Sequence, residues 1–138
     1  MTPKQITQIE RHLAKVLGWH VELYIHTMFH DPSKREVYCD SQGFAQIDVA
    51  GWHPCSDPAQ AAMVRAEIGI MGWRYRLGSI FTEELLFSCE IWKPTDPIPG
   101  HLGRAWHTLP QDAATAPTES LACCVAMFEA TGGMLEEK

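Results

Sequence analysis

Two short segments that begin helices constrain the fold of this chain more than any other feature. In the first, Asp57 stands directly before Pro58, and Gln60 follows the aspartate by three residues. An N-cap aspartate accepts a backbone hydrogen bond, proline suits the first helical position, and the Asp57–Gln60 spacing predicts a capping box. The second segment, residues 115–119, is also a helix start. Because two β-rich runs lie between the two starts, the sequence predicts a compact unit of helix, strand pair and helix.

Hydrophobic periodicity divides the rest of the chain. Apolar residues at three- and four-residue spacing predict helices over residues 4–17, 58–68 and 116–131. Alternating and apolar runs predict strands over residues 21–27, 36–39, 44–49, 73–81 and 85–92, with a turn at 30–34. We therefore expect a single α+β domain over residues 1–138. It should form an α-β-α sandwich, in which helices flank an antiparallel sheet.

A long loop over residues 93–113 has no periodicity, because prolines and glycines interrupt it. Loops of this length within compact domains are often functional. This one carries His101, Arg104, Trp106 and His107. The loop is therefore a candidate functional segment.

The composition is that of an acidic globular protein, with 46% apolar and 20% charged residues. The chain has no run of about 18 apolar residues, and its start lacks the apolar core of a signal peptide, so we expect a cytoplasmic protein without membrane association. A net charge of −6 disfavours direct nucleic-acid binding, since it repels a phosphate backbone. Five cysteines without a CxxC pair predict reduced thiols rather than a disulfide framework.

Residues suited to metal binding or nucleophilic catalysis do not form a coherent set. Zinc needs three or four convergent ligands, but the candidates are scattered: His26, His30, Cys39, Asp40, His53 and Cys55. Ser56 and Asp57 are explained by helix capping, Cys89 by burial in a strand, and Glu83 and Glu84 by an exposed hairpin tip. We therefore expect no metal, cofactor or catalytic residue, and the sequence favours a binding protein over an enzyme.

Aromatic and cationic residues give a stronger signal. Of the five tryptophans, Trp19 and Trp52 stand next to element boundaries and are expected to fill the core. Trp106 differs, because its neighbours are polar. Stacking rings and anion-binding cations are what a nucleotide-like ligand requires. These features predict a ligand-binding site made of Arg74, Arg76, His101, Arg104, Trp106 and His107. The alternative interpretation of the two strand arginines is a solvated strand face.

Four motifs in order along the chain resemble the phage ABA sandwich domain family, which consists of small proteins of bacteriophages and prophages. They are Leu17-Gly18-Trp19, Trp52-x-Pro54-x-Ser56-Asp57, Trp73-Arg74-Tyr75-Arg76, and Ala114-Thr115-Ala116-Pro117 followed by Leu121-Ala122-Cys123. The chain departs from the family in the loop 93–113 and in the segment 20–50, which varies most among such proteins. The resemblance implies the sandwich fold and a phage origin. The family has no established reaction, so no catalytic residue is implied.

Three functions remain open from the sequence. The first is a non-enzymatic phage accessory protein for counter-defence, which binds and sequesters a small nucleotide-like signal molecule in the host cytoplasm and can form a homo-oligomer. The second is an acidic, anti-CRISPR-like inhibitor that binds a host defence protein. The third is a small hydrolase that uses a metal or a thiol.

Overall fold

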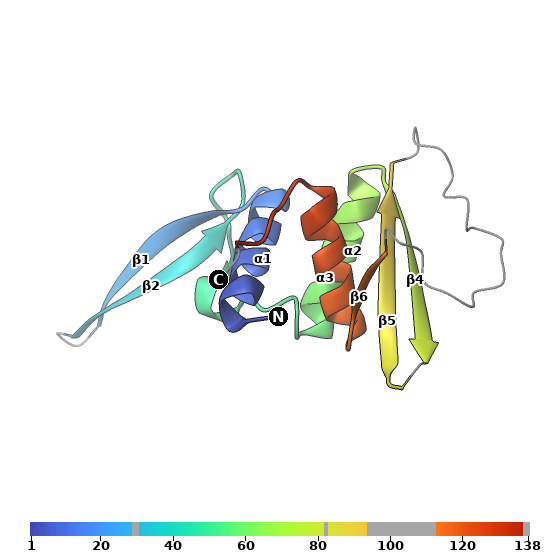
Figure 1. Ribbon diagram of the computed structural model, residues 1–138. Helices are drawn as coiled ribbons and strands as arrows, with labels where there is room; N and C mark the ends of the chain where they lie inside the picture. Colours follow the sequence, from blue (N-terminus) through green and yellow to red (C-terminus); the bar gives the residue numbers. More distant parts are fainter. Residues whose placement is uncertain (29–30, 82, 94–112, 137–138) are drawn as a thin grey trace.

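The protein has a layer of three helices between two three-stranded antiparallel sheets (Figure 1). The computed structural model describes residues 1–28, 31–81, 83–93 and 113–136. The elements are α1 (Pro3–Val16), β1 (His20–Met28), β2 (Asp31–Cys39), β3 (Ala45–Asp48), the short 3₁₀ helix η1 (Val49–Gly51), α2 (Pro58–Ile70), β4 (Arg74–Phe81), β5 (Leu85–Trp92), β6 (Ala114–Ala116) and α3 (Glu119–Ala130). The predicted α+β class is confirmed. None of the helices in the described part of the chain has the length and apolar character needed to cross a membrane.

The two sheets lie on opposite sides of the helices (Figure 1). The first has the strand order β1-β2-β3, so the segment 20–50 folds as a sheet of its own. Its β1–β2 hairpin extends away from the helices. The second sheet has the order β4-β5-β6, with β5 in the middle and α3 packed on it. The sequence predicted one sheet, whereas the strands form two. The residue pattern of a strand does not show which side of the helices the strand will cover, so it cannot assign strands to separate sheets.

Helix α3 is the centre of the core because it is apolar on nearly every side. Its buried residues are Ser120, Ala122, Cys123, Cys124, Val125, Ala126, Met127 and Phe128. A helix of this kind must be covered all round, and α1, α2, β5 and β6 cover it. Trp19 and Trp52 are also buried in this core, as the sequence predicted.

The caps of the helices agree with the sequence in part. The Asp57 carboxylate accepts hydrogen bonds from the N–H groups of Ala59 (2.9 Å) and Gln60 (3.3 Å), so the predicted cap of α2 is confirmed. The predicted capping box is wrong. The Gln60 side chain instead accepts from the N–H of His53 and donates to the carbonyl of Gly51. The glutamine therefore ties α2 to the segment that precedes it.

We expect the substitution Asp57→Ala to lower the free energy of unfolding by about 0.5–2 kcal/mol, because two N–H groups at the start of α2 lose their acceptor. Urea unfolding followed by circular dichroism measures the change. The conservative variant Asp57→Ser should recover most of the loss, since serine is also a good N-cap residue. Equal stability of Asp57→Ala and the parent protein would contradict the role of the cap.

The predicted start of the third helix at residue 116 is wrong. Residues Ala114–Ala116 form β6, which pairs with Phe87–Cys89 of β5. Helix α3 begins only at Glu119, where the Thr118 hydroxyl accepts a hydrogen bond from the N–H of Leu121 at 3.2 Å. Pro117 explains the difference, because the residue before a proline is held in extended backbone.

The predicted turn at residues 30–34 is wrong over residues 31–34. Strands β1 and β2 pair without a break from His20↔Cys39 to Met28↔Asp31. Pro32 lacks an N–H group, but it lies where β2 has a neighbouring strand on one side only, since β3 pairs with Val37–Cys39 alone. A proline is tolerated in such a position.

Candidate functional site

The structure describes only part of the site predicted from the sequence. His101, Arg104, Trp106 and His107 lie outside the described residues. Arg74 and Arg76 lie two residues apart on β4, opposite Trp92 and Glu90 of β5. Whether the loop meets this strand therefore stays a prediction.

The surface around Arg76 is not strongly cationic. Arg76 lines a hollow of about 250 Å³ together with Glu90, whose side chain is buried. The rest of the lining consists of small and apolar residues of β4 and β5, with Ser79 and Ser88 as its hydroxyl groups. Since a buried carboxylate shares the hollow, it offsets the charge that Arg76 would present to an anion.

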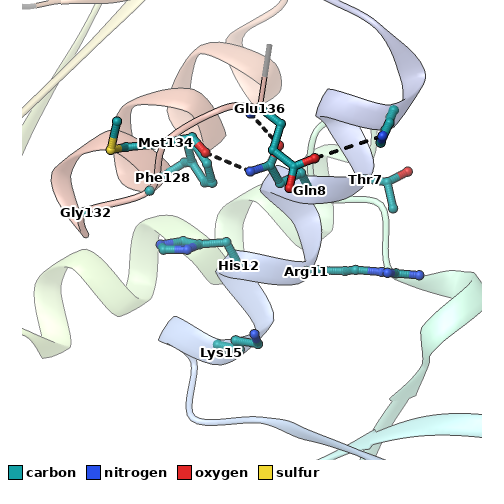
Figure 2. Close-up of a pocket in the computed structure, with 11 residues that line it drawn as sticks. Thr7, Gln8, Arg11, His12, Lys15, Phe128, Gly132, Met134 and Glu136 are labelled. Carbon is teal, nitrogen blue, oxygen red and sulfur yellow. Dashed lines mark hydrogen bonds and ion pairs between the residues drawn. The ribbon is translucent and has the colours of Figure 1, made fainter. Parts of the chain in front are cut away.

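A larger cationic site lies on α1. Lys4, Arg11 and Lys15 are seven and four residues apart, so they lie along one face of the helix. They line a hollow of about 600 Å³ between α1 and the C-terminal turn at residues 132–136 (Figure 2). Lys4 approaches Glu136 at 4.0 Å, whereas Arg11 and Lys15 have no ion-pair partner within the described ranges. Two exposed cations are thus available to an anionic ligand.

Gln8 fixes the wall of this hollow by holding the C-terminal turn against α1 (Figure 2). Its amide nitrogen donates a hydrogen bond to the carbonyl oxygen of Met134 at 2.7 Å. Its side-chain oxygen accepts from the N–H of Glu136 at 3.1 Å. Leu135, between these two residues, packs against the core. The two hydrogen bonds of Gln8 therefore hold Met134 and Glu136, and with them the intervening Leu135, against α1.

His12 joins the hollow to the core. Its Nε2 lies 2.7 Å from the Thr131 hydroxyl, and its ring meets the Phe128 ring edge-on at 4.8 Å. Because the Thr131 hydroxyl donates its proton to the carbonyl of Met127, it accepts from Nε2–H, which leaves Nδ1 of the neutral ring as an acceptor. Burial, and then the charge of Lys15, lower the pKa of His12 below its ordinary value. A neutral histidine adds a hydrogen-bonding group to the site, but no positive charge.

A second hollow, of about 560 Å³, lies between α1 and the first sheet. Arg11 and Lys15 line it as well, together with the rings of Trp19 and Tyr38. These rings are tilted toward each other with centroids 6.1 Å apart. The lining also includes the carboxylate of Glu36. Trp19 and Tyr38 are buried, so only small parts of their side chains reach this hollow. The two cations therefore lie between the two hollows. We call the two hollows with Arg11 and Lys15 the α1 surface.

A buried carboxylate and a histidine lie beside the α1 surface. Glu10 is 6% exposed; one of its oxygens lies 3.4 Å from Nδ1 of His53, and the other accepts from the N–H of Cys55 at 3.2 Å. Nε2 of His53 lies 2.7 Å from the carbonyl oxygen of Ala50. Both ring nitrogens thus face acceptors, so the geometry favours a protonated ring that joins two segments rather than a general base.

This arrangement predicts a pH-dependent stability. The Ala50 carbonyl, and then the Glu10 carboxylate, raise the pKa of His53 above 6.5. A raised pKa stabilises the fold fully below the unfolded value, and the contribution disappears as the pH rises through the folded value. We expect His53→Ala to cost more stability at pH 5.5 than at pH 8.5. The difference should be modest, because the side chain is 55% exposed. Urea unfolding at both pH values measures it, and an identical cost at both would refute the interpretation.

All five cysteines are buried, and none forms a disulfide. Cys123 of α3 interacts with Cys89 of β5, and its Sγ lies 3.8 Å from Nη1 of Arg65 on α2. The hydrogen bond from Cys89, and then the Arg65 guanidinium, lower the pKa of Cys123 to about 7 against the opposing effect of burial. Because Cys123 has no exposed surface, the geometry favours a core role over nucleophilic catalysis. The described residues also hold no group of three or more His, Cys, Asp or Glu side chains placed for a metal ion.

Comparison with protein-family models, with curated proteins and with solved structures found no match to this chain. The resemblance to phage ABA sandwich proteins therefore stays a prediction. The cations of the α1 surface could have been found in the sequence, because their spacing places them on one face of a helix predicted correctly. The hollow that they line could not be predicted, because no local sequence pattern indicates that residues 132–136 pack against α1.

Proposed function

We propose that this protein is a non-enzymatic binding protein that holds a small, anionic, nucleotide-like molecule on the α1 surface. The observation that carries the proposal is that Arg11 and Lys15 are exposed, have no ion-pair partner among the described residues, and border two hollows. Cations suit the phosphate group of such a ligand, and the apolar wall of the second hollow, which includes the small exposed parts of Trp19 and Tyr38, suits its base. In a chain of net charge −6, this local cationic face also concentrates anions at one place.

The biological setting of this proposal rests on the resemblance to phage proteins. A phage protein that sequesters a nucleotide-like signal would weaken a host defence that depends on that signal. Sequestration needs only affinity, and the exposed Arg11 and Lys15 of the α1 surface support it. We therefore propose a counter-defence role in the bacterial cytoplasm.

The test is a thermal-shift screen with nucleoside monophosphates, cyclic mono- and dinucleotides, the matching nucleosides and inorganic phosphate. A binder present at 100 times its dissociation constant should stabilise the fold by about 2.7 kcal/mol. We expect the nucleotides to stabilise the protein more than nucleosides or phosphate, since only they engage both halves of the site.

Two double variants decide where the ligand binds. Arg11→Ala/Lys15→Ala should weaken binding about tenfold or more, corresponding to the loss of at least one charge-assisted hydrogen bond. Arg74→Ala/Arg76→Ala should leave binding unchanged. The reverse result would assign the function to β4 and the loop 93–113. If no nucleotide binds and the protein purified from infected cells retains a host protein, the acidic-inhibitor alternative replaces this proposal.

A further inference from the structure

Strand β1 forms an open edge of the first sheet. It pairs with β2 along its whole length, and the described residues place no strand on its other side. The strand has nine residues, and its hairpin extends away from the helices (Figure 1). A long edge presents unpaired N–H and C=O groups, which are a template for pairing with another strand.

The same strand exposes a row of apolar side chains. Val21, Leu23 and Ile25 alternate along β1, so they share one face, and they are 49%, 56% and 57% exposed. Soluble monomers seldom combine an open edge with an apolar row, because the combination favours aggregation. The combination of an open edge and an exposed apolar row indicates that a partner covers β1.

We propose that the partner is a second copy of this chain, whose β1 pairs antiparallel with β1 about a two-fold axis at Leu23. In this register Leu23 faces Leu23, and Val21 faces Ile25 on both sides of the axis. Every apolar side chain of the row then meets another one. An axis at residue 22 or 24 would leave part of the row opposite residues outside it. The two sheets would join into one of six strands, with an isologous interface.

The charges of the hairpin agree with self-pairing. With the axis at Leu23, Glu22 lies opposite Tyr24 of the other copy, whereas an axis at residue 22 would place Glu22 against Glu22. Over residues 20–39, the acids Glu22, Asp31 and Glu36 are nearly balanced by the bases Lys34 and Arg35. The whole chain carries a net charge of −6. The hairpin is therefore a surface on which two otherwise acidic molecules can meet without strong repulsion.

The first experiment measures the mass of the full chain by sedimentation equilibrium over a range of concentrations. We expect a concentration-dependent dimer. The variant Leu23→Lys should raise the dimer dissociation constant about tenfold or more, because it places two ammonium groups opposite each other. Ile70→Lys is the matched control, since Ile70 is 76% exposed at the end of α2, and it should leave the dimer intact. Circular dichroism shows whether each variant is folded.

The second experiment tests the register by cross-linking. Leu23→Cys should give a covalent dimer under mild oxidation, because paired positions bring the two Cα atoms within disulfide range. Ile25→Cys should not, since its two copies would lie about 14 Å apart along the strands, beyond that range. A parent protein that stays monomeric at high concentration, or equal cross-linking of the two variants, would overturn the proposal. A dimer unaffected by Leu23→Lys would also overturn it.

Discussion

Replacing Trp52 with alanine is expected to lower the free energy of unfolding by about 3–5 kcal/mol, the cost of emptying a large core site. Trp52 is 2% exposed and meets the Trp19 ring edge-on at 4.9 Å. Its indole N–H donates a hydrogen bond to the backbone carbonyl of Glu10 at 2.8 Å. The ring therefore joins α1 to the segment before α2 by both packing and hydrogen bonding. Urea unfolding followed by circular dichroism is the appropriate measurement, because the substitution also changes tryptophan fluorescence.

Two further variants separate the causes of this loss. Trp52→Phe keeps an aromatic ring and removes the N–H donor, so it should cost less than alanine. Phe44→Ala removes a ring that is 65% exposed and should change stability by no more than about 0.5 kcal/mol. If Trp52→Ala were as mild as Phe44→Ala, Trp52 would not be a core residue.

The second large effect is expected from adding a single methyl group. In Gly133→Ala, the new Cβ would lie 2.5–2.7 Å from three ring carbons of Phe128. Phe128 is almost fully buried, so its ring has little room to move. We expect a loss of about 1–3 kcal/mol, which is typical of overpacking. Thermal and urea unfolding both report it.

The matched control for this prediction is Gly69→Ala. Gly69 lies inside α2, and a Cβ there would meet no atom within 4 Å. Alanine should therefore stabilise the protein by about 0.5–1 kcal/mol, because it favours the helix over the unfolded chain. Opposite signs for the two glycine substitutions are the expected result, and a neutral Gly133→Ala would show that the C-terminal turn can move away from Phe128.

The sequence was sufficient for the elements that local physics determines. The Asp57 cap, the periodicity of α1 and α2 and the apolar runs of β4 and β5 all depend on neighbours close in the chain. The sequence was insufficient where contacts between segments distant in the chain determine the local structure. Ala114–Ala116 forms a strand because it pairs with β5, which is distant in the chain. The Gln60 side chain does not complete a capping box, because it bonds instead to the backbone of Gly51 and His53.

The candidate site shows the same division. The sequence predicted a site of aromatic and cationic groups on β4 and the loop 93–113, and this stays a prediction; the α1 surface is a different site, with two exposed cations beside two buried rings. Its location depends on Gln8 holding residues 134 and 136, and on the first sheet bringing Tyr38 toward Arg11. Such long-range contacts have no signature in a single sequence.

The position of the helices between the two sheets has a consequence for how this molecule can change over evolutionary time. Within the described residues, no strand of one sheet pairs with a strand of the other. In the described part of the chain, the helices lie between the two sheets, so the effect of a substitution in β1, β2 or β3 on β4, β5 and β6 is expected to pass mainly through the helices, which pack against one another. Each end of the molecule can thus acquire a new partner or ligand while the other end keeps its own, and an engineer could exchange one sheet for another on an unchanged helical layer.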